Sequence, residues 1–561
     1  MPNPFRRSLS AIVLACLVCS GQETPTFRAT TTLIEFTFIA LDRKGNPVTD
    51  LKKEDISIIE KGKPREVVFF RFEGEIGETP QPQSLPPGIF SNRSEVTPGP
   101  PRNVTAIVLD TLNTAPGDQV WVRAQVMRYL RTMAGDMRVA VYAMGNQMSV
   151  LHDFTDDTES LRARIDQIAT QLQTQITANI DQTARDAEQL LETVPPEDRE
   201  VMQEILTRQI ETDMLYNENV RERRTKQSLA SLAALGNHLA GIPGRKSVVW
   251  ISGGISMLSI TGAMGMGSRG GIKSYETLVQ QTSKRLAHQG ITLYLVDARG
   301  LQGPAGNSAD IGGPAQVGRP RPFERQQQAS TISGDPLPAM FKMASVTGGR
   351  VVFNSNDPAQ GIKAILADSR GTYSVGFYAM GEPDNKWHNL NLKVRRPGVK
   401  LLYRKGYLSE APPEVAQDWS DGEWGLAIRN PLGSTALRLD ARCELTADAD
   451  VPAVNIVLHV IAEDLHFREM SGQMGAEFEV GLAEKTTAGA FNLRRNATGV
   501  SFPAGNADQI NRGAVRYALR AKLTPGTAAI RLIVRDRFTG RYGTLDVPVK
   551  TIPIGSTERV Q

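Results

Sequence analysis

The sequence predicts an α/β protein whose central domain is a doubly wound, mostly parallel sheet, with a β region on either side. Two observations predict this class. Between residues 102 and 408, nearly continuous apolar runs alternate with helical segments, as in parallel strands that are covered on both faces. Before and after that stretch, apolar and polar residues alternate with a period of two, which is typical of half-buried strands.

The central α/β domain is expected over residues 102–408. Its first strand is the apolar run Asn103–Leu109, which ends at Asp110, and a helical pattern follows over 118–133. Further strands are predicted at 138–143, 148–154, 247–251, 291–296 and 350–353. A helical segment precedes each of the last three, so the sheet is expected to be wrapped on both faces.

A long insertion, about 158–240, separates the third and fourth strands. Two apolar stripes at near-helical spacing, interrupted by Pro195-Pro196, predict a helical hairpin. The simpler interpretation is that the two stripes form a mutual core, and the alternative is a groove for a partner. A second departure is the segment 301–335, whose Gly, Pro and Gln content predicts a mobile loop.

The flanking regions are predicted to be β structures. A small β module is expected over 26–75, with a hairpin turn at Lys61-Gly62-Lys63, and the proline-rich stretch 76–101 is expected to be a linker. After about residue 415 the helical signal disappears, and alternating runs predict a β-sandwich over 415–555.

The first 21 residues are typical of an export signal. Arg6 and Arg7 precede an apolar stretch over 9–18, which is shorter than the roughly 20 residues that span a bilayer. We therefore expect an exported protein that is periplasmic, secreted or on the cell surface. Cys16 and Cys19 leave lipid anchoring open as an alternative, and cleavage would leave Cys443 as the remaining thiol, without a disulfide framework.

Composition and motifs weigh against nucleic-acid binding and catalysis. The formal net charge is only +4, whereas phosphate binding needs concentrated Lys and Arg. The glycine pattern over 265–270 starts too far from its strand to cradle a pyrophosphate. No metalloprotease motif and no paired acid and base stand out, so we expect a protein that is not an enzyme.

Three stretches carry a resemblance to a known family. They are Asp110–Thr114, Val296–Gly300, and Thr347–Arg350 together with Tyr373–Tyr378. The sequence over about 102–370 resembles the von Willebrand factor type A family, and more closely the acidobacterial proteins with a von Willebrand factor type A–related domain. The resemblance implies a doubly wound fold and a role in adhesion or protein binding.

In that family the first strand ends in Asp-x-Ser-x-Ser, which helps to bind a divalent cation. Asp110 and Thr114 match this pattern, but Leu112 replaces the middle hydroxyl and Gly253 stands where the family has a later Asp. Ser252 matches the family's preceding Thr. The favoured interpretation is that Asp110 and Asn113 cap loops and that no cofactor is bound.

The alternative is an Mg²⁺ or Ca²⁺ site with non-standard ligands at the carboxyl ends of the strands. Its candidate ligands are Asp110, Asn113, Thr114 and Asp297.

The favoured function is an exported, non-enzymatic module for protein–protein interaction, adhesion or scaffolding, with a protein partner. We expect the partner to contact the rim at the carboxyl ends of the strands, which the helical insertion should overhang. The residues expected at this rim are Asp110, Asn113, Thr114, Ser252 and Asp297. The alternatives are a metal-dependent adhesin and a hydrolase of unknown type; the hydrolase would require that mutation of Ser252 or Asp297 abolishes turnover.

Overall fold

The computed structural model describes most of the chain after residue 31. The described residues are 32–73, 85–93, 103–130, 138–155, 187, 189–261, 271–300, 335–355, 357–368, 371–411, 415–446, 452–470, 473–486, 491–503 and 513–554. The predicted signal peptide (1–21) lies outside them, as does nearly all of the predicted mobile loop. No helix among the described residues is long and apolar enough to cross a membrane.

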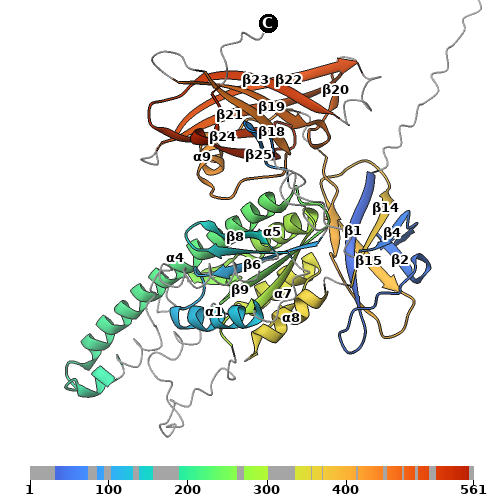
Figure 1. Ribbon diagram of the computed structural model, residues 1–561. Coiled ribbons are helices and arrows are strands. Elements are labelled where there is room, and N and C mark those ends of the chain that lie inside the picture. The colour runs from blue at the N-terminus through green and yellow to red at the C-terminus, as the bar shows by residue number, and fades with distance from the viewer. Residues whose placement is uncertain are drawn as a thin grey trace, which may run out of the picture.

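A six-stranded sheet forms the centre of the α/β region (Figure 1). Its strands are β6 (Asn103–Asp110), β7 (Val139–Met144), β8 (Met148–Thr155), β9 (Arg245–Ser252), β12 (Ile291–Asp297) and β13 (Val351–Val352). Their order is β13-β12-β9-β6-β7-β8, and every pair is parallel except β7 with β8. This is the order of a doubly wound sheet: the chain adds β7 and β8 on one side of β6 and then adds β9, β12 and β13 on the other side.

Helices cover both faces of this sheet. One face carries α1 (Pro116–Leu130) and α8 (Pro358–Asp368), and the other carries α4 (Arg199–Leu239), α5 (Glu276–His288) and α7 (Leu337–Thr347). The alternating side chains of β9 show why, since Val249 packs on the first face while Val248 and the fully buried Trp250 pack on the second. A small hairpin of β10 (Leu258–Thr261) and β11 (Gly271–Ser274) follows β9.

The structure differs from the predicted helical hairpin over residues 158–240. Its second stripe belongs to α4, a single helix of 41 residues whose last turns bury Leu229, Leu235 and Leu239 against the sheet. The end of the predicted insertion is therefore one of the covering helices of the α/β fold. The other end of α4 projects from the sheet (Figure 1), and there Ile210 packs with Ala187. The first predicted stripe, over 161–180, lies outside the described residues.

The N-terminal β module contains strands from two distant parts of the chain. β1 (Thr32–Leu41), β2 (Ile56–Glu60), β3 (Lys63–Arg65) and β4 (Phe69–Phe72) combine with β14 (Thr372–Ala379), β15 (Trp387–Val394), β16 (Lys400–Tyr403) and β17 (Gly406–Leu408). They form two four-stranded sheets, ordered β16-β1-β14-β4 and β17-β15-β2-β3, around one core. Residues 372–408 therefore belong to the β module rather than to the α/β sheet, where the sequence analysis placed them.

The C-terminal region forms two packed sheets. One has the order β23-β19-β18-β5 and the other β20-β21-β24-β25, with β22 paired to β21. Their strands are β5 (Ile89–Ser91), β18 (Leu439–Thr446), β19 (Ala453–Ile461), β20 (Arg468–Met470), β21 (Gln473–Thr486), β22 (Phe491–Pro503), β23 (Ala514–Lys522), β24 (Thr527–Asp536) and β25 (Tyr542–Pro548). Because β5 pairs with β18, part of the predicted linker 76–101 is a strand of this sandwich.

Short helical elements complete these regions. α9 (Asp421–Arg429) packs Trp424 on the outer face of β21 and β24. Single 3₁₀ turns occur at Lys53–Asp55, Ala462–Asp464 and Val549–Thr551. The sandwich joins the α/β region at the end of α4, where the Thr435 hydroxyl donates to the carbonyl of His238 (2.8 Å) and accepts from the amide of Gly241 (2.8 Å).

Candidate functional site

The carboxyl ends of three parallel strands bring three of the predicted rim residues to one edge of the sheet. Asp110 ends β6, Ser252 ends β9 and Asp297 ends β12. β9 lies between the other two strands, and Asp297 is directly opposite Ser252 in the register. In doubly wound sheets this edge is where ligands bind.

The carboxylate of Asp110 is buried and accepts five hydrogen bonds. Its Oδ1 accepts from the backbone amides of Leu112 and Asn113, both at 2.9 Å. Its Oδ2 accepts from the Ser252 hydroxyl (2.6 Å), the Asn113 side-chain amide (2.7 Å) and the Trp250 indole (3.1 Å). These bonds connect Asp110 to the loop after β6, and both carboxylate oxygens accept at least two of them.

Burial raises the pKa of the Asp110 carboxyl, and the donors from Ser252, Asn113 and Trp250 act in the opposite direction. Asp110 also interacts electrostatically with Arg224 on α4, whose own pKa is lowered mainly by burial. The hydrogen bonds to Asp110 given above all come from neutral donors.

Gly253 packs against the loop that follows β6, at Asn113 and Thr114. Its amide donates to the Thr114 hydroxyl at 3.1 Å. A Cβ atom at this position would lie 2.4 Å from the carbonyl oxygen of Asn113, which is closer than non-bonded atoms approach. An aspartate in place of Gly253 would therefore require the backbone to move.

Helix α4 lies over the same edge. The Asn113 side chain donates to the Ser228 hydroxyl at 2.7 Å, and Gln227 donates to the backbone carbonyl of Asn146 after β7. Sequence reasoning missed Ser228, because the register of α4 against the sheet is not visible in its apolar stripe. It also missed Trp250, although this residue is two positions from Ser252 on the same face of β9.

Asp297 is bonded to its own loop. Its carboxylate accepts from the backbone amide of Arg299 (3.0 Å) and forms a two-pronged ion pair with the guanidinium of that residue (2.9 and 2.8 Å). The structure thus joins Asp110, Asn113 and Ser252 by direct hydrogen bonds and places Thr114 on the adjoining Gly253, but Asp297 is engaged separately.

The donor set at this edge does not fit the cation of the resembled family. Hard cations need several free oxygen ligands, whereas both oxygens of Asp110 are occupied and Leu112 and Gly253 supply no side-chain oxygen. The Asn113 amide donates to Asp110 through its nitrogen, as assigned from the hydrogen-bond network. Within the described ranges, no group of three or more His, Cys, Asp or Glu side chains is placed to hold a metal ion.

Comparison with known proteins gives structural neighbours only. No protein-family model matches the sequence, and no curated protein matches it. An aerotolerance-related membrane protein from Bacteroides fragilis is 13% identical, with a TM-score of 0.23 over 48% of this chain and 98% of its own. The conserved hypothetical protein BatB from Bacteroides thetaiotaomicron is also 13% identical, with a TM-score of 0.22 over 48% of this chain and 97% of its own.

A third neighbour is proximal thread matrix protein 1 from the mussel byssus, in a structure with a zinc-occupied MIDAS motif. It is 10% identical, with a TM-score of 0.21 over 50% of this chain and 48% of its own. The fold class of the present chain rests on its own strand order rather than on these neighbours.

Proposed function

We propose that this chain is an exported, non-enzymatic protein that binds a protein partner at the carboxyl-end rim of its parallel sheet without a divalent metal. The observation that carries the proposal is the closed set of five hydrogen bonds on Asp110. Protein donors bind both oxygens of this carboxylate, which supports a rim that is held by hydrogen bonds within the chain rather than by a cation. Export is supported by the basic and apolar pattern of the first 21 residues.

The partner contact on this proposal is made by the loops that the rim residues shape. Asp110, Thr114, Ser252 and Asp297 are buried, while Asn113 is half-buried. The neighbouring Ala115, Asn146 and Gln147 are exposed at the same edge and offer polar backbone and amide groups. Loops at this position commonly carry the binding function of a rigid α/β scaffold.

A hydrolytic role for Ser252 is less well supported by the geometry. Its hydroxyl donates to Asp110 at 2.6 Å, accepts from the amide of Gly254 at 2.7 Å and is fully buried. A nucleophile needs a base aligned on it and access to the substrate. The buried hydroxyl of Ser252 instead serves as a structural donor.

The experiment that tests the proposal is affinity capture from native envelope extracts on the immobilised mature protein, with EDTA or with Mg²⁺. We expect equal capture in both buffers, and a loss of capture when Asn146 and Gln147 are both replaced by Arg. Asn492→Arg, an exposed change on the sandwich, is the matched control. Capture that EDTA abolishes would favour the metal-dependent adhesin, and capture that survives the double substitution would place binding away from the rim.

A further inference from the structure

One half of an edge of β1 has no neighbouring strand among the described residues. β16 pairs with β1 only over Phe38–Leu41, and its last residue, Tyr403, lies opposite Phe38. The chain then leaves this sheet to form β17, which pairs with β15 in the other sheet of the module. The stretch Thr32–Phe36 is therefore paired with β14 on one side and has no paired strand on the other side among the described residues.

Arg404 shows which backbone groups face the open side. Its Nη2 donates to the carbonyl oxygen of Glu35 at 2.9 Å, so this carbonyl points away from β14. In a strand the N–H and C=O groups of alternate residues point to the same side. Leu33 and Glu35 therefore present their backbone hydrogen-bonding groups to the open edge, whereas Thr37 lies beside Arg404, which follows the last paired residue of β16.

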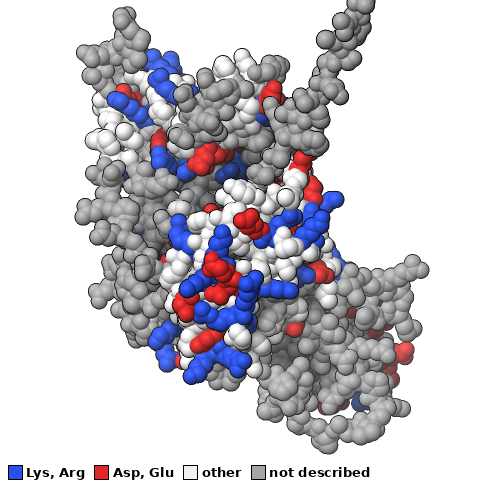
Figure 2. All heavy atoms as spheres, turned by 90° about the vertical axis from the view of Figure 1, so that its right-hand side faces the viewer, with Lys and Arg blue, Asp and Glu red and all other residues white. Residues whose placement is uncertain are grey.

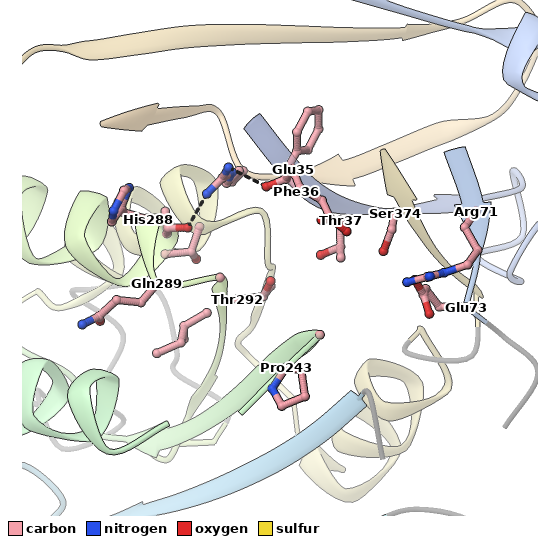
Figure 3. Close-up of a pocket in the computed structure, with 16 residues that line it drawn as sticks. Glu35, Phe36, Thr37, Arg71, Glu73, Pro243, His288, Gln289, Thr292 and Ser374 are labelled. Atoms are coloured by element: carbon pink, nitrogen blue, oxygen red, sulfur yellow. Dashed lines mark hydrogen bonds and ion pairs between the residues drawn. The ribbon is translucent and has the colours of Figure 1, made fainter. Parts of the chain in front are cut away.

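Two hollows border this part of β1. One, of about 600 Å³, lies between one face of the sheet, at Glu35, Thr37, Ser374 and Arg71, and the segment Ala287–Thr292, which joins the end of α5 to the start of β12 (Figure 3). The second, of about 310 Å³, borders Thr32–Glu35 on the other side of Arg404, which lines both. Glu35, His288 and Arg404 line both hollows, and we call the two together the β1 groove. Its volume is in the range of sites that accommodate a short peptide or a small molecule.

Arg404 contributes a cation to the groove without a carboxylate beside it in the described part of the chain. Its two Nη atoms donate to the carbonyl oxygens of Ala287 (3.0 Å) and Glu35, and its guanidinium lies 5.8 Å from the centre of the Phe36 ring. Burial lowers its pKa to about 10. The side chain is half-buried, and a guanidinium group that is partly removed from water is stabilised by an anion beside it.

The other charged groups of the groove are engaged or exposed. Arg71 is bound to Glu73 through Nε at 2.7 Å, and His288 contacts Glu410 at 3.4 Å. The Glu35 side chain is exposed. On the face that Figure 2 draws, acidic and basic side chains are interspersed among the described residues. We therefore base the sign of a ligand on the local charge at Arg404.

Two exposed apolar side chains lie beside the open edge of β1. Leu33 is 48% exposed and Met380, just after β14, is 73% exposed. Both border the smaller hollow beside Thr32. Alternate side chains of an added strand would rest on them, since residues on one face of paired strands contact each other.

We propose that the β1 groove binds an extended peptide of a partner protein, which adds as a strand to Thr32–Phe36 and places a carboxylate against Arg404. Peptide N–H and C=O groups would pair with Leu33 and Glu35, and one peptide N–H would take over the Glu35 carbonyl from Arg404. The released Nη2 then donates to the carboxylate. Strand addition gives affinity through the backbone, and the ion pair selects the sequence. This site is separate from the rim and does not depend on the function proposed for it.

The probe is a random dodecapeptide display library selected on the full mature protein, followed by fluorescence polarisation of the enriched peptides. We expect enriched sequences to share an acidic residue, and a Glu→Gln or Asp→Asn change in the peptide to weaken binding by about tenfold or more, as for the loss of one desolvated ion pair. Arg404→Gln should remove that preference, whereas Arg404→Lys should retain part of it. Thermal unfolding of each variant checks that the fold is kept.

Hydrogen exchange on the wild-type protein tests the strand addition without any substitution. Bound peptide should slow amide exchange in the segment 32–36 by about tenfold or more, with no change in β22 as the internal control. An absence of enriched peptides, enrichment without an acidic residue, or unchanged exchange over 32–36 would each overturn the proposal. If deleting residues 22–31 is required before any peptide binds, the chain's own N-terminal segment is the occupant instead.

Discussion

The Ser252 hydroxyl donates a 2.6 Å hydrogen bond to the Asp110 carboxylate, joining the ends of two adjacent parallel strands. Both side chains are buried, so neither finds water as a replacement partner. Hydrogen bonds to a charged group are worth more than neutral ones, because the buried charge is costly when a donor is lost.

Ser252→Ala should therefore lower the free energy of unfolding by about 1–3 kcal/mol. Four donors remain on Asp110, which keeps the loss below that of removing the carboxylate. Urea unfolding followed by circular dichroism measures the effect. Ser274→Ala, in which an exposed hydroxyl loses a 3.2 Å bond, is the control and should change stability by less than about 0.5 kcal/mol. Equal effects of the two substitutions would mean that the Asp110 network contributes no stability.

Gly253→Asp restores the residue type of the resembled family but should not create a metal site. The added Cβ would lie 2.4 Å from the Asn113 carbonyl oxygen, and both oxygens of Asp110 are already bonded. We expect a stability loss of about 1–3 kcal/mol from the overpacking. Titration calorimetry with Mg²⁺ should give no heat, or only millimolar affinity, for both the wild type and the variant. A micromolar site in either protein would contradict this account of the edge.

The sequence was sufficient to locate this edge but not its chemistry. Asp110, Ser252 and Asp297 could be placed together because each ends an apolar run, and parallel strands share an edge. The hydrogen-bond partners of the rim residues could not be assigned in full. Ser228 comes from α4, more than 100 positions along the chain, and only the three-dimensional packing of that helix brings it to Asn113.

Asp368, at the end of α8, should make stability depend on pH. Burial raises its pKa from 3.8 to about 6, although Arg350 and Arg245 oppose the shift. The folded state therefore binds this proton more tightly than the unfolded state. The cost of ionising it, up to about 3 kcal/mol, is fully present above pH 6 and disappears as the pH falls towards 4.

The wild type should consequently gain stability relative to Asp368→Asn between pH 7 and pH 4.5, because the asparagine does not titrate. Urea unfolding of both proteins across this range measures the difference. Asp357→Asn, at an exposed helix start, serves as the matched variant, since no comparable burial acts there. A constant difference between wild type and Asp368→Asn would mean that the carboxyl keeps an ordinary pKa in the folded state.

The domain boundaries were the weakest part of the sequence-based prediction, for a physical reason. Local alternation of apolar residues identified β1, β2, β14 and β15 as strands, but it does not say which strands pair. β14 follows α8 in the chain, so it was assigned to the α/β sheet. It instead pairs with β1 over eight residues, more than 300 positions away.

The small β module should therefore not fold from residues 26–75 alone. That fragment lacks β14, which pairs with β1, and β15, which pairs with β2, so the core faces of both sheets would be exposed to water. We expect a poorly dispersed amide spectrum and a circular dichroism spectrum of an unfolded chain.

Joining residues 32–73 to 371–411 through a short Gly/Ser linker should give a folded protein, because the amide of Glu73 already donates to the carbonyl of Thr372 at 2.8 Å. In the joined protein, Tyr373→Ala should cause unfolding, since this ring stacks on Phe38 with centroids 5.0 Å apart at the centre of the module. A folded 26–75 fragment would show that the first four strands form a domain without the strands that follow α8.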